Sequence, residues 1–338
     1  MKQNRWFSVV LTVVLLLSVC GCTQRDEPES GFDNTVMGGG WCTYRDGFIY
    51  FSDNTRMYEY DTLSGATVDL GHIDDYFAKG LFVMDDKLVY MVSGGKNNAT
   101  LHYITRDGKE SGVLPGTYGA GGVSLDGDNW YFGANKLSDD KSVMHKQFWR
   151  RNVETGQEML LLELEASNGY YLHGEHIYII EFYTVGNSGD YEKDQDCRLL
   201  RSSKDQIVFE TMDMNVKPIN LVFDGEDMYM SRRGDWRICR YADGKETVLP
   251  VASFTYLVFD GHLFYQDATP GNVKPRGNPL KTYNLETEEE KIIVESMFEF
   301  AILGNRHVVY SSTLDGSNFR YYVYDWQTGE TREMVKPA

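Results

Sequence analysis

The chain repeats one short pattern of apolar and polar residues. In each copy, two alternating apolar segments flank a polar turn, as in "YRDGFIYFS" at 44–52, where the turn is Asp-Gly. Two-residue hairpin turns favour Asp-Gly because both central residues adopt a positive φ. Each copy therefore predicts two antiparallel strands joined by a tight turn. The copies lie at residues 44–52, 83–92, 124–133, 171–180, 222–231, 258–267 and 302–312.

Each hairpin is followed by further alternating segments. A third segment such as "RMYEYD" (56–61) leads through a second turn to a fourth, such as "MLLLEL" (159–164). Four antiparallel strands repeated every 36–51 residues are typical of β-propeller blades. The sequence thus predicts an all-β protein, a seven-bladed β-propeller of four-stranded antiparallel blades over residues 40–338, rather than one of six or eight blades. Because the copies are contiguous, we expect no strand to be exchanged between the first and last blades.

One tyrosine occupies the same position in every copy. Aromatic side chains fill the space between packed sheets well, so we expect these tyrosines to lie between neighbouring blades. They are Tyr50, Tyr90, Tyr131, Tyr178, Tyr229, Tyr265 and Tyr310.

The N-terminal residues have the order of a secretory signal. Lys2 and Arg5 precede an apolar run that ends at Val19, and "VCGC" at 19–22 resembles the bacterial lipoprotein box. We expect a signal peptide at 1–21, lipidation of Cys22 and a flexible acidic tether over 22–39. The protein would then lie on the cell membrane and face outside the cytoplasm. The alternative is an uncleaved anchor, although the run of about 14 residues is short for a span of roughly 20.

Charge and cysteine content narrow the class of partner. The chain has 338 residues and a net charge of −17, and no basic stripe interrupts the acidic residues. Nucleic acid and anionic membrane surfaces are therefore poor partners, and contact with the membrane is expected through the lipid alone.

Cys42, Cys197 and Cys239 remain beyond the lipid site. An odd number argues against a disulfide framework, so we expect buried thiols.

"YFSD" at 50–53 resembles the Tyr-Trp-Thr-Asp phrase of the low-density lipoprotein receptor propellers, the YWTD type. The chain resembles more closely the bacterial surface lipoproteins with an uncharacterised domain of this type, over roughly residues 40–338. The other copies keep only the tyrosine, and the receptor propellers have six blades. The resemblance implies an extracellular role, either protein-binding or uncharacterised, and it implies no catalytic residues.

The connection between second and third strands varies most among the copies. It is long at 133–146, 181–196 and 267–279, and in a propeller these connections share one face with the links between blades. Long loops on a rigid scaffold are frequent binding sites, and aromatic and guanidinium groups supply most interface energy. Solvated loop decoration is the alternative. The candidate ligand-binding residues are Tyr183, Tyr191, Arg232, Arg233, Trp236 and Arg276.

Several sharper motifs give weaker support for a site. "DYEKDQD" (190–196) offers alternate carboxylates to calcium but lacks the EF-hand glycine and closing glutamate. Four turn histidines, His173, His176, His262 and His307, would have to converge to bind zinc. "RGD" at 233–235 invites an integrin-type interpretation, and pairing of Arg233 with Asp235 is the simpler one. We therefore expect neither a metal nor a cofactor.

Catalysis has little support in the predicted inner strands. Propeller glycosidases need two carboxylates facing each other across the central funnel, and Glu299 is the main acidic residue there. We therefore expect no catalytic residues and a protein that binds an extracellular protein or a cell-surface polymer through its loop-rich face. The alternatives are a hydrolase or lyase acting on a saccharide in the funnel, and a structural spacer.

Overall fold

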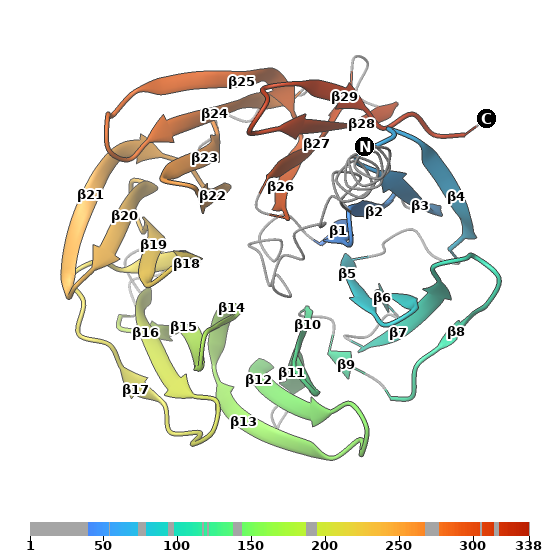
Figure 1. Ribbon diagram of the computed structural model, residues 1–338. Coiled ribbons are helices and arrows are strands. Elements are labelled where there is room, and N and C mark those ends of the chain that lie inside the picture. The colour runs from blue at the N-terminus through green and yellow to red at the C-terminus, as the bar shows by residue number, and fades with distance from the viewer. Residues whose placement is uncertain are drawn as a thin grey trace, which may run out of the picture.

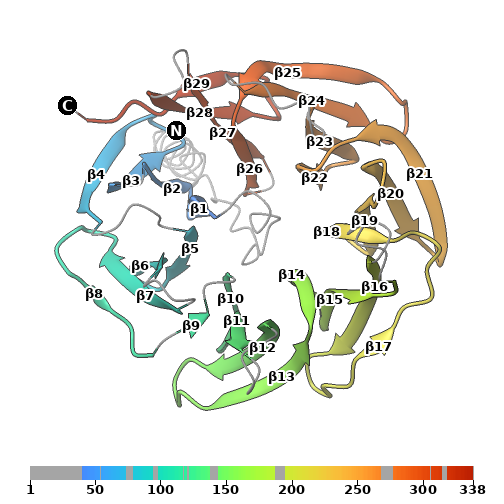
Figure 2. The same ribbon diagram turned by 180° about the vertical axis from the view of Figure 1, so that it is seen from behind.

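The computed structural model describes residues 40–53, 55–73, 79–93, 98–116, 118–119, 122–137, 144–186, 195–267, 277–304, 306–313 and 318–337. This part of the chain is built of strands arranged in blades around one axis (Figures 1 and 2). The predicted signal peptide and tether, the predicted lipidation site Cys22, and the candidates Tyr191 and Arg276 lie outside the described residues. Within the described residues, no helix has the length and apolar character needed to cross a membrane.

Seven blades of four antiparallel strands form the ring, which confirms the predicted fold. Blade 1 contains β1 (Cys42–Arg45), β2 (Phe48–Ser52), β3 (Arg56–Asp61) and β4 (Thr67–His72). Blade 2 contains β5 (Lys79–Met84), β6 (Lys87–Ser93), β7 (Asn98–Thr105) and β8 (Ser111–Val113), and β9 (Tyr118–Gly119) also pairs with β7. Blade 3 contains β10 (Val123–Asp126), β11 (Asn129–Leu137), β12 (Met144–Asn152) and β13 (Glu158–Leu164).

The remaining four blades repeat the same order. Blade 4 contains β14 (Ala166–His173), β15 (His176–Thr184), β16 (Gln195–Ser203) and β17 (Glu210–Thr211). Blade 5 contains β18 (Pro218–Asp224), β19 (Asp227–Arg232), β20 (Arg237–Ala242) and β21 (Lys245–Ala252). Blade 6 contains β22 (Tyr256–Phe259), β23 (His262–Gln266), β24 (Asn278–Asn284) and β25 (Glu290–Met297). Blade 7 contains β26 (Glu299–Leu303), β27 (His307–Thr313), β28 (Phe319–Asp325) and β29 (Thr331–Glu333).

The tight turns have the backbone that the Asp-Gly pattern predicts. Asp46 and Gly47 have φ values of 53° and 85°, and Asp260 and Gly261 have values of 50° and 68°. Two consecutive residues with positive φ match the right-handed twist of the flanking strands. The turns therefore set the register of the hairpins, in which Arg45 faces Phe48 in blade 1.

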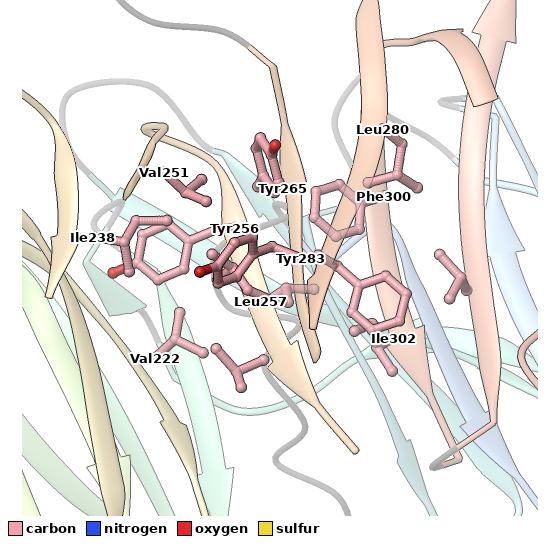
Figure 3. Close-up of a cluster of buried hydrophobic side chains, with 14 of the residues drawn as sticks. Val222, Ile238, Val251, Tyr256, Leu257, Tyr265, Leu280, Tyr283, Phe300 and Ile302 are labelled. Atoms are coloured by element: carbon pink, nitrogen blue, oxygen red, sulfur yellow. The ribbon is translucent and has the colours of Figure 1, made fainter. Parts of the chain in front are cut away.

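The seven aligned tyrosines lie on the second strands of the blades, and all seven are buried. Five of them face a charged residue of the third strand, in the pairs Tyr50–Glu59, Tyr131–Arg150, Tyr178–Arg201, Tyr229–Arg240 and Tyr265–Lys281. Their rings belong to apolar clusters shared by neighbouring blades, which Figure 3 shows for blades 5, 6 and 7. The predicted position between sheets is confirmed, and the ring is held together chiefly by this packing.

Each sheet consists of one continuous segment, so no strand is exchanged between blades 1 and 7, as the sequence predicts. Side chains of the two blades pack directly against each other instead, and the tail after β29 joins them through Met334. The buried residues of this junction are Trp41, Cys42, Ile49, Phe51, Tyr58, Tyr60, Ala301, Leu303, Val309, Tyr321, Val323 and Met334.

An ion pair closes the same junction. Lys336 Nζ lies 2.8 Å from Asp53 Oδ2 and 5.2 Å from the centre of the Tyr321 ring. Burial alone would raise the pKa of the Asp53 carboxyl, but hydrogen bonds from Lys336 and Thr55 outweigh it and lower the pKa to about 2. The tail after β29 is thereby attached to blade 1.

This pKa shift predicts a pH dependence of stability. A carboxyl whose pKa is lower in the folded state than its ordinary 3.8 stabilises the fold above about pH 4, and this contribution disappears as the pH falls through about 2. We expect the free energy of unfolding of the wild type to fall more steeply over this range than that of Asp53→Asn. Urea denaturation at a series of pH values measures both, and parallel curves would contradict the role of Asp53.

The strand order defines two faces of the ring. The tight-turn face contains the turns between first and second strands and between third and fourth strands, and the loop face contains the second-to-third connections and the links between blades. Gly40, before β1, and the tail after β29 both lie on the loop face. The predicted sharing of one face by long connections and blade links follows from this order.

Among the described residues, the second and third strands of blades 3 and 4 are longer than those of the other blades. Their second and third strands β11, β12, β15 and β16 each have nine residues, compared with five to eight in the other blades. Residues 133–137, 144–146, 181–184 and 195–196, which were predicted as loop, are therefore paired strand. The prediction missed them because these strand ends carry polar residues such as Lys136 and Thr184, which are also common in loops. We call the two extensions the blade 3 ribbon and the blade 4 ribbon.

Candidate functional site

A pocket of about 560 Å³ lies on the loop face between the blade 3 and blade 4 ribbons. The link between the blades also lines it, because this link crosses from the outer strand β13 to the inner strand β14. We call it the blade 3/4 pocket. Its lining residues are His145, Glu163, Leu164, Glu165, Glu181, Tyr183 and Thr184.

Glu163 dominates the blade 3 side of the pocket. It accepts a hydrogen bond from Gln147, the residue opposite it on β12. Lys136 Nζ lies 3.5 Å and His145 Nδ1 lies 3.8 Å from its carboxylate oxygens. The hydrogen bond from Gln147 lowers the pKa of Glu163, with Lys136 and His145 adding to the effect against a smaller opposing effect of burial. The pocket wall therefore carries an ionised carboxylate at neutral pH.

The blade 4 side combines a carboxylate with an aromatic ring. Glu181 and Tyr183 lie two residues apart on β15 and so share one face of the sheet. Arg198 on β16 donates a hydrogen bond to Glu181, and its guanidinium carbon lies 5.5 Å from the centre of the Tyr183 ring. The guanidinium therefore fixes both side chains in place at the pocket.

The rest of the rim combines an exposed carboxylate with apolar side chains. Glu165, in the link between blades, is exposed and forms no ion pair within the described residues. Leu137 and Met144 face each other at the end of the blade 3 ribbon, and each is 44% exposed. Val185, after β15, is 56% exposed. The pocket is thus polar inside and flanked by apolar tips.

Of the predicted ligand-binding residues that the structure describes, Tyr183 alone lines this pocket. Arg233 reaches its neighbourhood from blade 5, because Arg233 Nη1 donates to the carbonyl oxygen of Gln195 at 2.7 Å, and Gln195 faces Thr184 in the blade 4 ribbon. Arg232 and Trp236 lie further along the loop face in blade 5. The structure therefore brings Tyr183 and Arg233 together and leaves Arg232 and Trp236 beside them.

The "RGD" turn pairs differently from the expectation. Arg232, not Arg233, donates to Asp235, with 2.9 Å between Arg232 Nε and Asp235 Oδ1. The turn brings them together because Trp236 has a φ of 60° and its amide donates to the carbonyl oxygen of Arg232. Trp236 then packs edge-to-face on Phe254 of the next blade link. These groups are held in fixed positions and are not free loop tips.

The inner strands offer no facing pair of carboxylates in the described residues. Glu299 on β26 is the acidic residue at their loop-face ends, whereas Asp126 and Asp224 end β10 and β18 at the tight turns. Glu299 lies close enough to Cys42 that, together with burial, it raises the pKa of that thiol. A raised pKa disfavours the thiolate, so Cys42 is not an activated nucleophile.

Two of the turn histidines contact other residues of the protein and do not converge on one another. His173 stacks on Phe223 with ring centres 4.3 Å apart and bonds the Gly225 carbonyl oxygen of blade 5, and His262 bonds Asn284. Among the described residues no three His, Cys, Asp or Glu side chains are grouped as a metal site. Of the calcium candidate, residues 190–194 lie outside the described residues, and Asp196 pairs with Lys217.

A second pocket, of about 670 Å³, lies between blades 1 and 2 on the tight-turn face. Turn residues line it, including Asp85, Asp86 and Asp107. Arg106 there donates to Tyr50 at 2.7 Å and pairs with Asp46 of blade 1. These contacts join neighbouring blades, so this pocket belongs to the junction that holds the ring together.

Four lining residues of the blade 3/4 pocket were missed from sequence: His145, Glu163, Glu165 and Glu181. His145 and Glu181 fell in stretches read as loops, and Glu163 and Glu165 fell in and after an outer strand. No alternation of apolar and polar residues marks these long strands, since β15 reads HIYIIEFYT with apolar residues at consecutive positions. Only the pairing of blades in space brings the four together.

Neither a comparison with protein-family models nor one with curated proteins finds a match to the chain. Solved structures do match. The β-propeller domain of the Trilobed protease from Pyrococcus furiosus, described as having an open velcro topology, has a TM-score of 0.60 at 12% identity, over 87% of this chain and 96% of that chain.

Two other structures match equally well. Oligogalacturonate lyase in complex with manganese has a TM-score of 0.58 at 14% identity, over 86% of this chain and 89% of that chain. Puromycin hydrolase has a TM-score of 0.62 at 11% identity, over 92% of this chain and 57% of that chain. At such identities the likeness shows the fold alone, and the chain is a seven-bladed β-propeller.

Proposed function

We propose that the protein is a lipid-anchored, extracytoplasmic β-propeller of the bacterial surface lipoprotein kind. In this proposal it binds an extracellular protein or a cell-surface polymer through its loop face. The signal-like N-terminus and the lipoprotein box at Cys22 support the location, and the "YFSD" phrase supports the YWTD-type resemblance.

The observation that carries the binding role is the blade 3/4 pocket. It lies on the loop face between two ribbons longer than those of any other blade, and Tyr183 lines it beside groups fixed by Arg198. Fixed polar and aromatic side chains around a recess are the usual features of a binding site, because little conformational entropy is lost when a ligand arrives.

The alternative, a saccharide hydrolase or lyase acting in the central funnel, has less support. Such an enzyme needs an acid and a second carboxylate on facing elements. The described inner strands provide Glu299 on the loop-face side and no facing partner carboxylate. The other alternative, a structural spacer, does not account for the pocket.

A crosslinking pull-down from intact cells tests location and surface together. We expect the wild type to be retained in the membrane fraction and to capture a specific partner. Cys22→Ala should be released from that fraction, and Tyr183→Ala should stay on the membrane and lose the partner by at least about tenfold. Glu154→Ala, in an exposed turn on the opposite face, is the matched control and should capture as the wild type does. Equal capture by Tyr183→Ala would refute the loop-face site.

A further inference from the structure

We propose that the blade 3/4 pocket binds a glycan without anionic groups, that is, a chain of uncharged or amino sugars. The inference rests on the proposed binding function of the loop face and specifies its ligand. It makes the cell-surface polymer, rather than a protein, the occupant of this site.

The size and position of the pocket suit a segment of a polymer. A volume of about 560 Å³ falls within the roughly 300–1,000 Å³ typical of small-ligand sites. The site lies between two ribbons and not at the closed end of a cavity. A few sugar rings of a chain can therefore occupy the recess.

The lining offers what sugar hydroxyl groups need. Glu163, Glu165 and Glu181 are hydrogen-bond acceptors, and a carboxylate can accept from two neighbouring hydroxyls through its two oxygens. Such charge-assisted bonds are about twice as strong as neutral ones. Thr184 adds a hydroxyl that donates and accepts.

Tyr183 supplies the apolar part of sugar recognition. One face of a pyranose ring consists of C–H groups, which pack against the flat face of an aromatic side chain. Arg198 holds the Tyr183 ring by lying over it and is itself fixed by Glu181. The ring is therefore placed before a ligand arrives, which reduces the entropy lost on binding.

Charge selects against anionic sugars. The three carboxylates exceed the two cations beside them, Lys136 and Arg198, by one, and the whole chain carries −17. The excess negative charge is that of Glu165, which has no ion pair within the described residues and so favours a neutral or cationic ligand. A uronate or phosphate group would be repelled by this carboxylate, because Lys136 and Arg198 are already paired with Glu163 and Glu181.

Calorimetric titration of the purified chain tests this with three probes of equal length: cellotetraose, chitosan tetramer and tetragalacturonate. We expect cellotetraose or the chitosan tetramer to bind at least about tenfold more tightly than tetragalacturonate. Tyr183→Ala should weaken that binding by about tenfold, and Tyr183→Phe, which keeps the ring, should stay within about threefold of the wild type.

A matched pair of charge variants tests the selection. Glu165→Gln keeps an acceptor and removes the charge. We therefore expect the ratio of the affinities for the tighter-binding probe and for tetragalacturonate to fall by about threefold or more. Glu154→Gln removes a charge from the opposite face and should leave the preference unchanged. An equal narrowing in both variants would mean that the overall charge, not the pocket, discriminates, and this would overturn the proposal.

The remaining outcomes separate the glycan inference from the proposed function. Tighter binding of tetragalacturonate, or binding unaffected by Tyr183→Ala, overturns the glycan inference. If none of the three probes binds but the wild type captures a protein from cells and Tyr183→Ala does not, the inference fails and the binding function stands. If neither experiment shows binding, both proposals fail.

Discussion

Met334→Ala is expected to lower the free energy of unfolding by about 2–5 kcal/mol, the usual range for truncating a buried methionine. Met334 is 1% exposed and packs among residues of blades 1 and 7, and its amide donates to the Tyr321 carbonyl oxygen at 2.8 Å. Because no strand is exchanged between these blades, the cavity would form where the ring depends on side-chain packing. Urea denaturation followed by tryptophan fluorescence measures the loss.

Val335→Ala is the matched control. The neighbouring Val335 is 65% exposed, so its truncation should change the free energy of unfolding by no more than about 0.5 kcal/mol. If the two variants lose the same stability, the tail after β29 does not close the ring as the packing indicates.

Asn220→Leu should cost about 3–5 kcal/mol, although the two side chains have similar volumes. Asn220 Oδ1 accepts from the Ser231 amide at 3.0 Å and from the Tyr256 hydroxyl at 2.9 Å, and its Nδ2 donates to the Phe254 carbonyl oxygen at 3.1 Å. These bonds join blade 5 to blade 6 beside the apolar cluster of Figure 3, in which Tyr256 is fully buried. Leucine would leave buried donors unpaired, at about 1–3 kcal/mol each.

A double variant distinguishes unpaired donors from altered packing. Tyr256→Phe removes the hydroxyl that Asn220→Leu would leave unpaired, so the double variant should be more stable than the sum of the single losses predicts, by about 1–2 kcal/mol. Chemical denaturation of the wild type, the two single variants and the double variant gives the coupling free energy between the two positions. Simple additivity would mean that the Tyr256 hydroxyl is satisfied in another way.

The repeated hairpin pattern predicted the fold because it depends on local chemistry. An Asp-Gly turn needs two residues with positive φ, and Asp46 and Gly47 adopt them in the structure. The tyrosine three or four residues beyond each turn then falls in the buried part of the second strand, so the number of aligned tyrosines gave the number of blades. The limits of blades 3 and 4 could not be predicted in this way, because an exposed ribbon and a polar loop have similar compositions.

The site was predicted only in part, for a related reason. Tyr183 was chosen as an aromatic residue in a long connection, and it lines the pocket. His145 and Glu163 come from another blade and Glu165 from a link, and no spacing along the chain relates Glu163 to Glu181. Arg233 and Arg232 illustrate the limit of local reading, because only the backbone of Trp236 decides which arginine meets Asp235.

The use of one continuous segment for each sheet has a consequence for how the fold can change. A propeller with an exchanged strand has one blade made of two distant pieces, so removing or adding a repeat there breaks a sheet. Here every blade is a complete unit, and both described ends of the ring lie on the same face next to each other. Joining them and opening a link such as 211–218 would preserve every strand pairing, so circular permutation and whole-blade duplication are both compatible with this architecture.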